Sequence, residues 1–245
     1  MSNLLNKRLA RSLWRTKPRL FAVVMMVAVG VFAGITFSGY SHNLDGMYET
    51  LHGDDDEGAN LADMWIDNRS TTWSHEEVTN FCSALEASWP ADMDELDSCE
   101  GRTIVQGTMF HSNDGGTQII NSLWHGIPEF ANADRLWMPS GHSEGRVASA
   151  ADEIVIDAHV VDALDLSLGD TVHIGAGSSP VEFSIVGIGY HPLHVFMAPE
   201  GSIFPPEPGQ YVVGYVSDSG MARLTNSTIG NSNTILLDVE GTPSF

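Results

Sequence analysis

Residues 20–37 have the sequence LFAVVMMVAVGVFAGITF, which carries no charge and in which Thr36 is the only polar side chain. As a helix with a rise of about 1.5 Å per residue, this stretch crosses most of the ~30 Å hydrocarbon core of a bilayer, and its continuation to Tyr40 completes the span. A helix also satisfies its own backbone hydrogen bonds, as lipid requires. We therefore predict a transmembrane helix over residues 20–40.

The flanks of this stretch predict its orientation. Six basic residues precede it and no acidic residue does, since the first acidic residue is Asp45. Because Lys and Arg close to a span tend to stay in the cytoplasm, we expect the N-terminus inside and the chain from about residue 41 outside. Residues 1–19 then form a basic cytoplasmic segment with leucines at helical spacing, as in an amphipathic helix at the membrane surface. The same residues could instead continue the helix into the membrane.

The main alternative to a retained span is a cleaved signal peptide. However, the basic region of nineteen residues is long, and the apolar run exceeds the ~7–15 residues that such peptides use. A signal-peptide cleavage site has two small residues separated by one residue of any kind. The best candidate here, Thr36-Phe37-Ser38, matches this pattern poorly. These features favour a retained anchor.

The chain beyond residue 19 is strongly acidic. It holds 32 Asp and Glu residues against five Arg and no Lys, a difference of 27 charges. Such a surface repels polyanions, which excludes nucleic acid as a partner. One explanation for the acidity is a saline environment, in which carboxylates keep the surface hydrated. The apolar content of 42% is enough for a folded core.

The only two cysteines, Cys82 and Cys99, both lie on the predicted outer side. In an oxidising compartment their default state is a structural disulfide. Closing a loop of this length contributes about 3 kcal/mol in the chain-entropy model. The alternative is two free thiols, and the spacing excludes a catalytic Cys-x-x-Cys motif.

The outer part has both helix and strand signals. Ser74 and Glu77 form a capping box, and the apolar face of the following helix includes Val78, Phe81 and Cys82 before Trp89-Pro90 ends it. An Asn-Asp-Gly-Gly turn separates strands predicted over residues 102–110 and 117–124, which indicates a β-hairpin. A short strand is predicted at the end of residues 60–67, and further strands are predicted over residues 153–156, 171–174, 181–189, 211–216 and 234–239.

Two other segments are expected to be less regular. Residues 125–145 are predicted to be rich in loops, and residues 221–233 to be loop-like or helical at their start. Asp157 can cap a helix over residues 158–166. The fold class is therefore α+β, with one N-terminal transmembrane helix followed by a mixed α/β exoplasmic domain. The predicted organisation is a basic segment (1–19), a span (20–40), a stalk (41–59) and the outer domain (60–245).

Several motifs resemble a known family. They are Asn60-Leu61-Ala62-Asp63-Met64-Trp65 after the span, Glu153-Ile154-Val155-Ile156-Asp157, the Leu-x-x-Gly-Asp turn within 164–172, and Phe183-Ser184-Ile185-Val186-Gly187-Ile188. In this order and spacing they resemble the outer domain of FtsX-like and MacB-like ABC transporter permeases, over roughly residues 7–239. The resemblance implies an outer domain of the MacB periplasmic-core type.

The resemblance also implies a function. The chain would be a permease subunit of an ABC-type export or mechanotransmission system, itself non-catalytic, that couples a cytoplasmic ATPase to the exoplasmic domain in the cell membrane. A second permease subunit and membrane lipid are further expected partners. The three later spans of the family do not follow in this sequence, so the outer domain is predicted to be truncated before them. The alternative is a single-span anchored binding or sensor domain without an ATPase.

No catalytic or cofactor-binding residue is predicted. The P-loop pattern is missing, so the chain is not expected to bind ATP in that way, and Ser140-Gly141-His142-Ser143 lacks the nucleophile elbow of hydrolases. His191 and His194, with Glu200 nearby, have the spacing of a zinc pair. No third ligand has a recognisable spacing, so we expect a structural loop and no metal.

Gly30 and Gly34 form a Gly-x-x-x-Gly pattern in the span, where small residues let helices pack closely. The alternative is the ordinary glycine content of membrane helices. Asn68 and Asn226 begin glycosylation sequons, whose use is left open.

Overall fold

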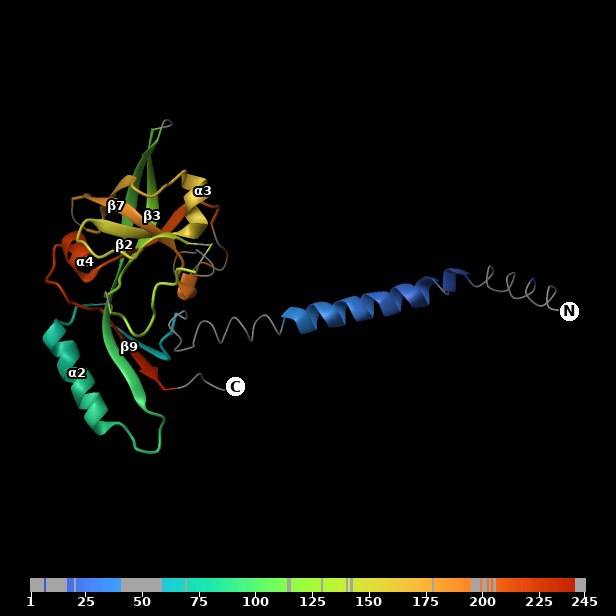
Figure 1. Ribbon diagram of the computed structural model, residues 1–245, viewed down its shortest axis with the longest axis horizontal. Helices are drawn as coiled ribbons and strands as arrows, with labels where there is room; N and C mark the ends of the chain where they lie inside the picture. The colour runs from blue at the N-terminus through green and yellow to red at the C-terminus, as the bar shows by residue number, and fades with distance from the viewer. Residues whose placement is uncertain are drawn as a thin grey trace. The chain divides into compact units, whose positions relative to one another are not determined.

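The computed structural model divides into two compact units, residues 1–48 and 49–245, and each is described by itself (Figure 1). The predicted stalk lies outside the described residues except for Ala59. The described residues are 7, 17–19, 21–40, 59–68, 70–113, 116–128, 130–139, 141, 143–177, 179–194, 199, 202, 204 and 206–240.

As predicted, a helix covers the apolar stretch. It runs over Lys17–Tyr40 with a mean hydropathy of 2.5, and among the described residues it is the one helix long and apolar enough to cross a membrane. Its large apolar side chains, such as Phe21, Phe32 and Phe37, are exposed along its length. A surface of this kind is suited to lipid rather than to water.

The larger part of the outer domain is a closed β-barrel, here called the barrel lobe. Its strands follow one another around a ring in the order β2, β3, β8, β5, β7, β6 and back to β2, so that the sheet has no open side along most of its length. The strands are β2 (Leu96–Asn113), β3 (Gly116–Gly126), β5 (Glu153–Asp157), β6 (Thr171–Gly175), β7 (Val181–Gly189) and β8 (Tyr211–Val216), and the short β4 (Glu144–Gly145) pairs with the end of β7.

Alternating side chains from these strands fill the barrel. Trp124 and Phe183 are among the largest buried side chains. The indole of Trp124 lies directly over Gly214 on the adjacent β8, and a Cβ atom at Gly214 would overlap the six-membered ring. The indole Nε1 donates to Ser122 Oγ at 2.8 Å, so its polar atom is satisfied inside the core.

The first part of β2 continues out of the barrel and forms a second, smaller region, here called the sheet lobe. Its three strands are antiparallel in the order β1 (Met64–Asp67), β9 (Thr234–Val239), β2. Helix α2 (His75–Ser88) lies beside this part of β2 (Figure 1), and its Val78 packs on Ile235 and Leu237 of β9.

Most predicted elements are confirmed. Ser74 caps α2 together with Glu77 in a capping box, and the hairpin of β2 and β3 turns where the Asn-Asp-Gly-Gly signal predicts. Strands β7, β8 and β9 have the predicted bounds. The α+β fold class is therefore confirmed.

Some predictions are wrong in detail. His125 and Gly126 belong to β3 rather than to a loop. The helix expected over residues 158–166 is a 3₁₀ turn, η1 (Ala158–Val160), followed by a single α-turn, α3 (Val161–Leu164). It ends early because Asp165 adopts the left-handed conformation, with φ of 52°.

Two further differences concern helices. The segment 221–233, expected to be loop-like or helical at its start, begins inside the helix α4 (Asp218–Thr225), which starts three residues earlier because the Ser217 side chain accepts from Gly220 N. On α2, Phe81 is 39% exposed although its spacing placed it on the apolar face.

Candidate functional site

A belt of buried polar side chains lies where the sheet lobe meets the barrel lobe, and we call it the junction. Buried polar groups are unusual unless they are paired, so this belt is the first place to look for function. Its buried members are Asn60, Arg102, His125, Asp134, His191 and Asp238.

The segment that leads into the outer domain is held against the end of β9. Asn60 Nδ2 donates to Asp238 Oδ2 at 2.7 Å and to Asn132 O at 3.0 Å. Asp63 Oδ2 accepts from Val239 N at 3.0 Å. The chain therefore enters the outer domain and leaves β9 at the same place.

Asp134 holds the same leading segment from the other side. Its carboxylate accepts from Ala62 N at 2.9 Å and from Trp65 Nε1 at 3.1 Å. Its own N–H donates to Asn60 O at 2.6 Å, and Arg135 N donates to Ala59 O at 2.7 Å. Burial raises the pKa of Asp134, while the hydrogen bonds from Ala62 and Trp65 act in the opposite direction.

Arg102 is a buried cation at the point where β2 passes from the sheet lobe into the barrel lobe. Its Nη2 donates to Ala133 O at 2.5 Å and lies 3.2 Å from Glu100 Oε2. Burial lowers the pKa of Arg102, and the neighbouring Glu100 carboxylate opposes that shift. A buried charge of this kind is stabilising only while its partners stay in place.

Three histidines pack together beside Asp134. His125 comes from β3, while His191 precedes the 3₁₀ turn η2 (Pro192–His194) and His194 is its last residue. The ring centroid of His125 lies 5.4 Å from that of His191 and 4.9 Å from that of His194. The Nε2 atoms of His125 and His194 are 2.8 Å apart, so one must donate while the other accepts.

All three histidines are neutral at pH 7, because burial lowers the pKa of each. Burial lowers the pKa of both His191 and His194 to about 4, and it holds the pKa of His125 well below its usual value. If His125 and His194 were both protonated, two N–H groups would face each other across the 2.8 Å contact. The packing of η2 on β3 is thus sensitive to acid.

These groups form a continuous series of contacts from the leading segment to the barrel interior. His191 Nε2 lies 3.2 Å from Asp134 O, and the His191 ring stacks on Tyr215 with centroids 5.6 Å apart. The Tyr215 hydroxyl donates to Asp157 Oδ2 at 3.2 Å in the barrel. Burial raises the pKa of both Tyr215 and Asp157, so the chain ends in a buried acid pair. A displacement of the leading segment would have to break or move these contacts.

The structure brings together the two histidines that the sequence singled out, and His125 joins them. Glu200 and two members of the Ser140–Ser143 motif, Ser140 and His142, lie outside the described residues. In the part of the outer domain that the structure describes, no group of three or more His, Cys, Asp and Glu side chains is arranged to hold a metal ion. The imidazoles pack against one another instead.

The other candidate residues lie away from the junction. Cys82 on α2 and Cys99 on β2 are joined in a disulfide, with Cα atoms 5.6 Å apart. Gly30 and Gly34 lie on the N-terminal helix, where a Cβ atom at either would meet no other described atom within 4 Å. Their packing against another span stays a prediction.

The sequence missed His125, Arg102 and Asp134 as members of one site. Side chains alternate between the two faces of a strand, so if β3 continues past Trp124, His125 lies on the face opposite to the core. In the structure η2 covers this face. Asn60, Ala62 and Trp65 do belong to the Asn-Leu-Ala-Asp-Met-Trp motif. Their partner Asp134 lies about seventy residues further along, in a segment with no periodic signal.

Comparisons with known proteins find similar chains among solved structures. No family model matches this chain, and no curated protein does. The extracellular domain of the noncanonic ABC-type transporter YknZ from Gram-positive bacteria is 15% identical with a TM-score of 0.41, over 72% of this chain and 82% of that one. The periplasmic region of MacB from Actinobacillus actinomycetemcomitans is 13% identical with a TM-score of 0.42, over 74% and 75%.

The similar structures thus include the periplasmic region of MacB, whose family the sequence motifs resemble. The identities and TM-scores are low. What this chain does has to be inferred from its own residues.

Proposed function

We propose that this chain is a permease subunit of an ABC-type export or mechanotransmission system. In this proposal it has no catalytic role of its own. A cytoplasmic ATPase drives it, the helix Lys17–Tyr40 anchors it with the N-terminus in the cytoplasm, and the outer domain responds outside the cell. The family resemblance of the motifs implies this function, and the junction supplies a physical route for it.

The observation that carries the proposal is the pairing of the leading segment with the end of β9. Met64 pairs with Leu237, and Asp63 accepts from Val239 N at 3.0 Å. A domain inserted between two membrane spans must receive the chain and return it at one place, which is what these contacts provide.

The junction supports coupling as well as anchoring. A movement of the span would act on residues 59–63, which are bonded to Asp134 and through His191 to the barrel. Hydrogen-bonded networks with discrete alternative arrangements are the kind of element that passes such a movement on. These contacts are the path along which a movement of the span would reach the barrel, and the following experiment measures that movement.

The test uses the N-terminally tagged chain, purified from its native membrane in a mild detergent. We expect an ABC ATPase with a P-loop to copurify, and addition of a non-hydrolysable ATP analogue to change amide hydrogen exchange at residues 59–67 and 130–135. Strand β6 of the barrel, which contributes no residue to the junction, serves as the internal control and should not change. If no ATPase accompanies the protein, the anchored binding or sensor domain is the better function.

A second expected partner is another permease span, packed at Gly30 and Gly34. Changing both glycines to Leu should weaken association of the spans in a membrane two-hybrid assay. Gly39→Leu, in the same helix but outside the four-residue spacing, is the matched control. An unchanged signal in the double variant would remove these glycines from the proposal and leave the ATPase partnership untouched.

A further inference from the structure

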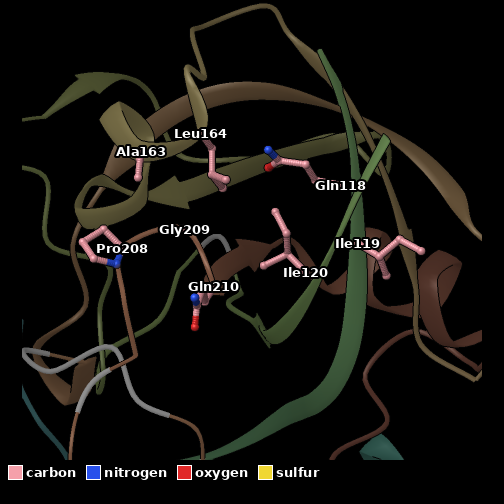
Figure 2. A pocket seen from close by; sticks show the side chains of 8 residues that line it. All are labelled: Gln118, Ile119, Ile120, Ala163, Leu164, Pro208, Gly209 and Gln210. Atoms are coloured by element: carbon pink, nitrogen blue, oxygen red, sulfur yellow. The ribbon is translucent and has the colours of Figure 1, made fainter. Parts of the chain in front are cut away.

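A pocket of about 460 Å³ opens on the barrel lobe between β3, α3 and the turn that leads into β8 (Figure 2). None of its residues belongs to the junction. It is lined by Gln118, Ile119, Ile120, Ala163, Leu164, Pro208, Gly209 and Gln210.

One wall of the pocket is an open strand edge. On this edge of β3, the parallel strand β8 pairs from Asn121 onward, opposite Tyr211. Between Gly116 and Ile120 no strand in the described part of the chain pairs with the same edge. Backbone N–H and C=O groups along this stretch therefore point to where a further strand would lie.

The side chains of this stretch suit an added strand. Figure 2 shows Gln118 and Ile120 directed toward the Leu164 side of the pocket, while Ile119 points the opposite way. Ile119 is 70% exposed. An extended peptide on this edge would place alternate side chains in the pocket and beside Ile119, which is the geometry of recognition by strand addition.

The charge pattern also points to a polypeptide partner. Exposed strand edges are usually protected by charged side chains, yet between Arg102 and Glu129 the only charged residue is Asp114. Carboxylates stand at the rim instead. Glu207 accepts from Gln210 Nε2 at 3.3 Å, and the exposed Asp162 lies beside Ala163 on α3. The acidic rim favours a segment that is neutral or basic, and it disfavours a second copy of this acidic domain.

We propose that this edge of β3 is a docking site for an extended, neutral or basic segment of another polypeptide, which adds as a strand beside residues 116–120. The backbone supplies most of the affinity, and the pocket beside Leu164 receives one side chain of the added strand. This inference goes beyond the coupling function and does not depend on an ATPase partner.

The test uses the full chain in detergent micelles and a phage library of random peptides of about eight residues, enough for one strand. Peptides that bind the wild type are kept, and those that also bind the Gln118→Trp variant are removed. In this variant the indole fills the pocket. Gln106→Trp is the matched control, because it places the same side chain at an exposed glutamine on β2 that does not line the pocket. Ile119→Glu and its control Ile229→Glu repeat the comparison with exposed isoleucines.

We expect peptides without Asp or Glu that bind the wild type and Gln106→Trp equally. Their affinity should fall about tenfold or more in Gln118→Trp and in Ile119→Glu. N-methylation of alternate amides in a synthetic copy should abolish binding, since it removes the backbone donors. The proposal is overturned if no peptide separates Gln118→Trp from Gln106→Trp, if the N-methylated copy binds equally well, or if Gln118→Trp changes self-association of the chain instead.

Discussion

The barrel lobe and the sheet lobe share strand β2 but are held together in different ways. Among the residues that the structure describes, the barrel encloses one cluster of 22 buried apolar residues, whereas the sheet lobe has two clusters of three. The sheet lobe, which buries fewer apolar residues, is also held together by directional bonds. These are the disulfide, the capping box and the hydrogen bonds of Asn60 and Asp134. Apolar burial tolerates small displacements, while directional bonds are either made or broken.

This difference assigns separate tasks to the two lobes. The barrel is the rigid body, because its closed sheet and large core leave few ways to deform. The sheet lobe is the region where the chain comes in, and its few polar bonds define its position. Substitutions should therefore act globally in the barrel and locally in the sheet lobe.

The largest effect is expected from Gly214→Ala in the barrel. The new methyl group would overlap the Trp124 ring, and overpacking of this kind costs about 3 kcal/mol of the free energy of unfolding. Chemical denaturation of the full chain would measure it. Because the clash is with the indole, Trp124→Leu should relieve it. The double variant should therefore lose less free energy of unfolding than the two single variants lose in sum. Strict additivity would contradict the proposed clash.

Removal of the disulfide should be nearly as large but local. Cys82→Ala with Cys99→Ala is expected to lower the free energy of unfolding by about 3 kcal/mol, because the 17-residue separation is no longer closed in the unfolded chain. Hydrogen exchange should lose protection in α2 and β9 and keep it in β5 and β7. Equal loss in both lobes would argue against their independence. Mass measurement of the untreated protein checks that the two thiols are bonded.

The clamp at Asp134 is the next test. Asp134→Ala leaves the N–H of Ala62 and the indole N–H of Trp65 without their acceptor, which costs about 2 kcal/mol. Asp134→Asn keeps one acceptor oxygen and tolerates the left-handed backbone at this position, where φ is 47°, so it should recover part of the loss. Limited proteolysis near residue 60 would follow the release of the leading segment, and indifference to both variants would remove the clamp from the proposal.

The effect that is smallest at neutral pH, and that grows only on acidification, is a pH dependence from the histidines. The unfolded chain takes up protons at His191 and His194 below their usual pKa of 6.5, whereas the folded chain resists protonation down to about 4. The free energy of unfolding should therefore rise with pH between about 4 and 6.5, by up to about 1.4 kcal/mol per pH unit for each histidine.

The comparison of wild type with His194→Gln isolates this slope. Gln can still hydrogen-bond His125 but does not titrate, so the dependence on pH should be shallower in the variant. Asp134, whose raised pKa acts with the opposite sign at the acid end of the window, is common to both proteins. Parallel curves for the two proteins would show that His194 is not the titrating group.

Local signals in the sequence predicted most of the fold. The capping box at Ser74, the Asn-Asp-Gly-Gly turn and the apolar strands β7 to β9 each depend on neighbouring residues, and each is confirmed. Barrel closure could not be predicted, because the pairing of β2 with β6 joins Thr108 to Gly175 and no local pattern specifies it. The shortened α3 was missed because Asp165 can adopt a left-handed conformation that only its surroundings select.

The junction was less accessible to sequence reasoning than the fold. Its residues come from six separate segments, and isolated Arg, Asp and His residues carry no periodicity. His191 and His194 were noticed because they are close in sequence, but His125 joins them only through the packing of η2 on β3. Polar contacts between distant segments are set by the tertiary fold, so no local sequence pattern predicts them.

The position of β9 between β1 and β2 has a consequence for the making of this protein. Met64 pairs with Leu237 and Arg102 with Thr234, so the central strand of the sheet lobe is the last of the described strands to be synthesised. Until β9 has been made, β1 and the first part of β2 have unpaired edges, which invite association with other chains. In the proposed topology, in which this domain folds outside the cell, its folding should therefore depend on an extracytoplasmic chaperone that shields those two strands until synthesis has passed residue 239.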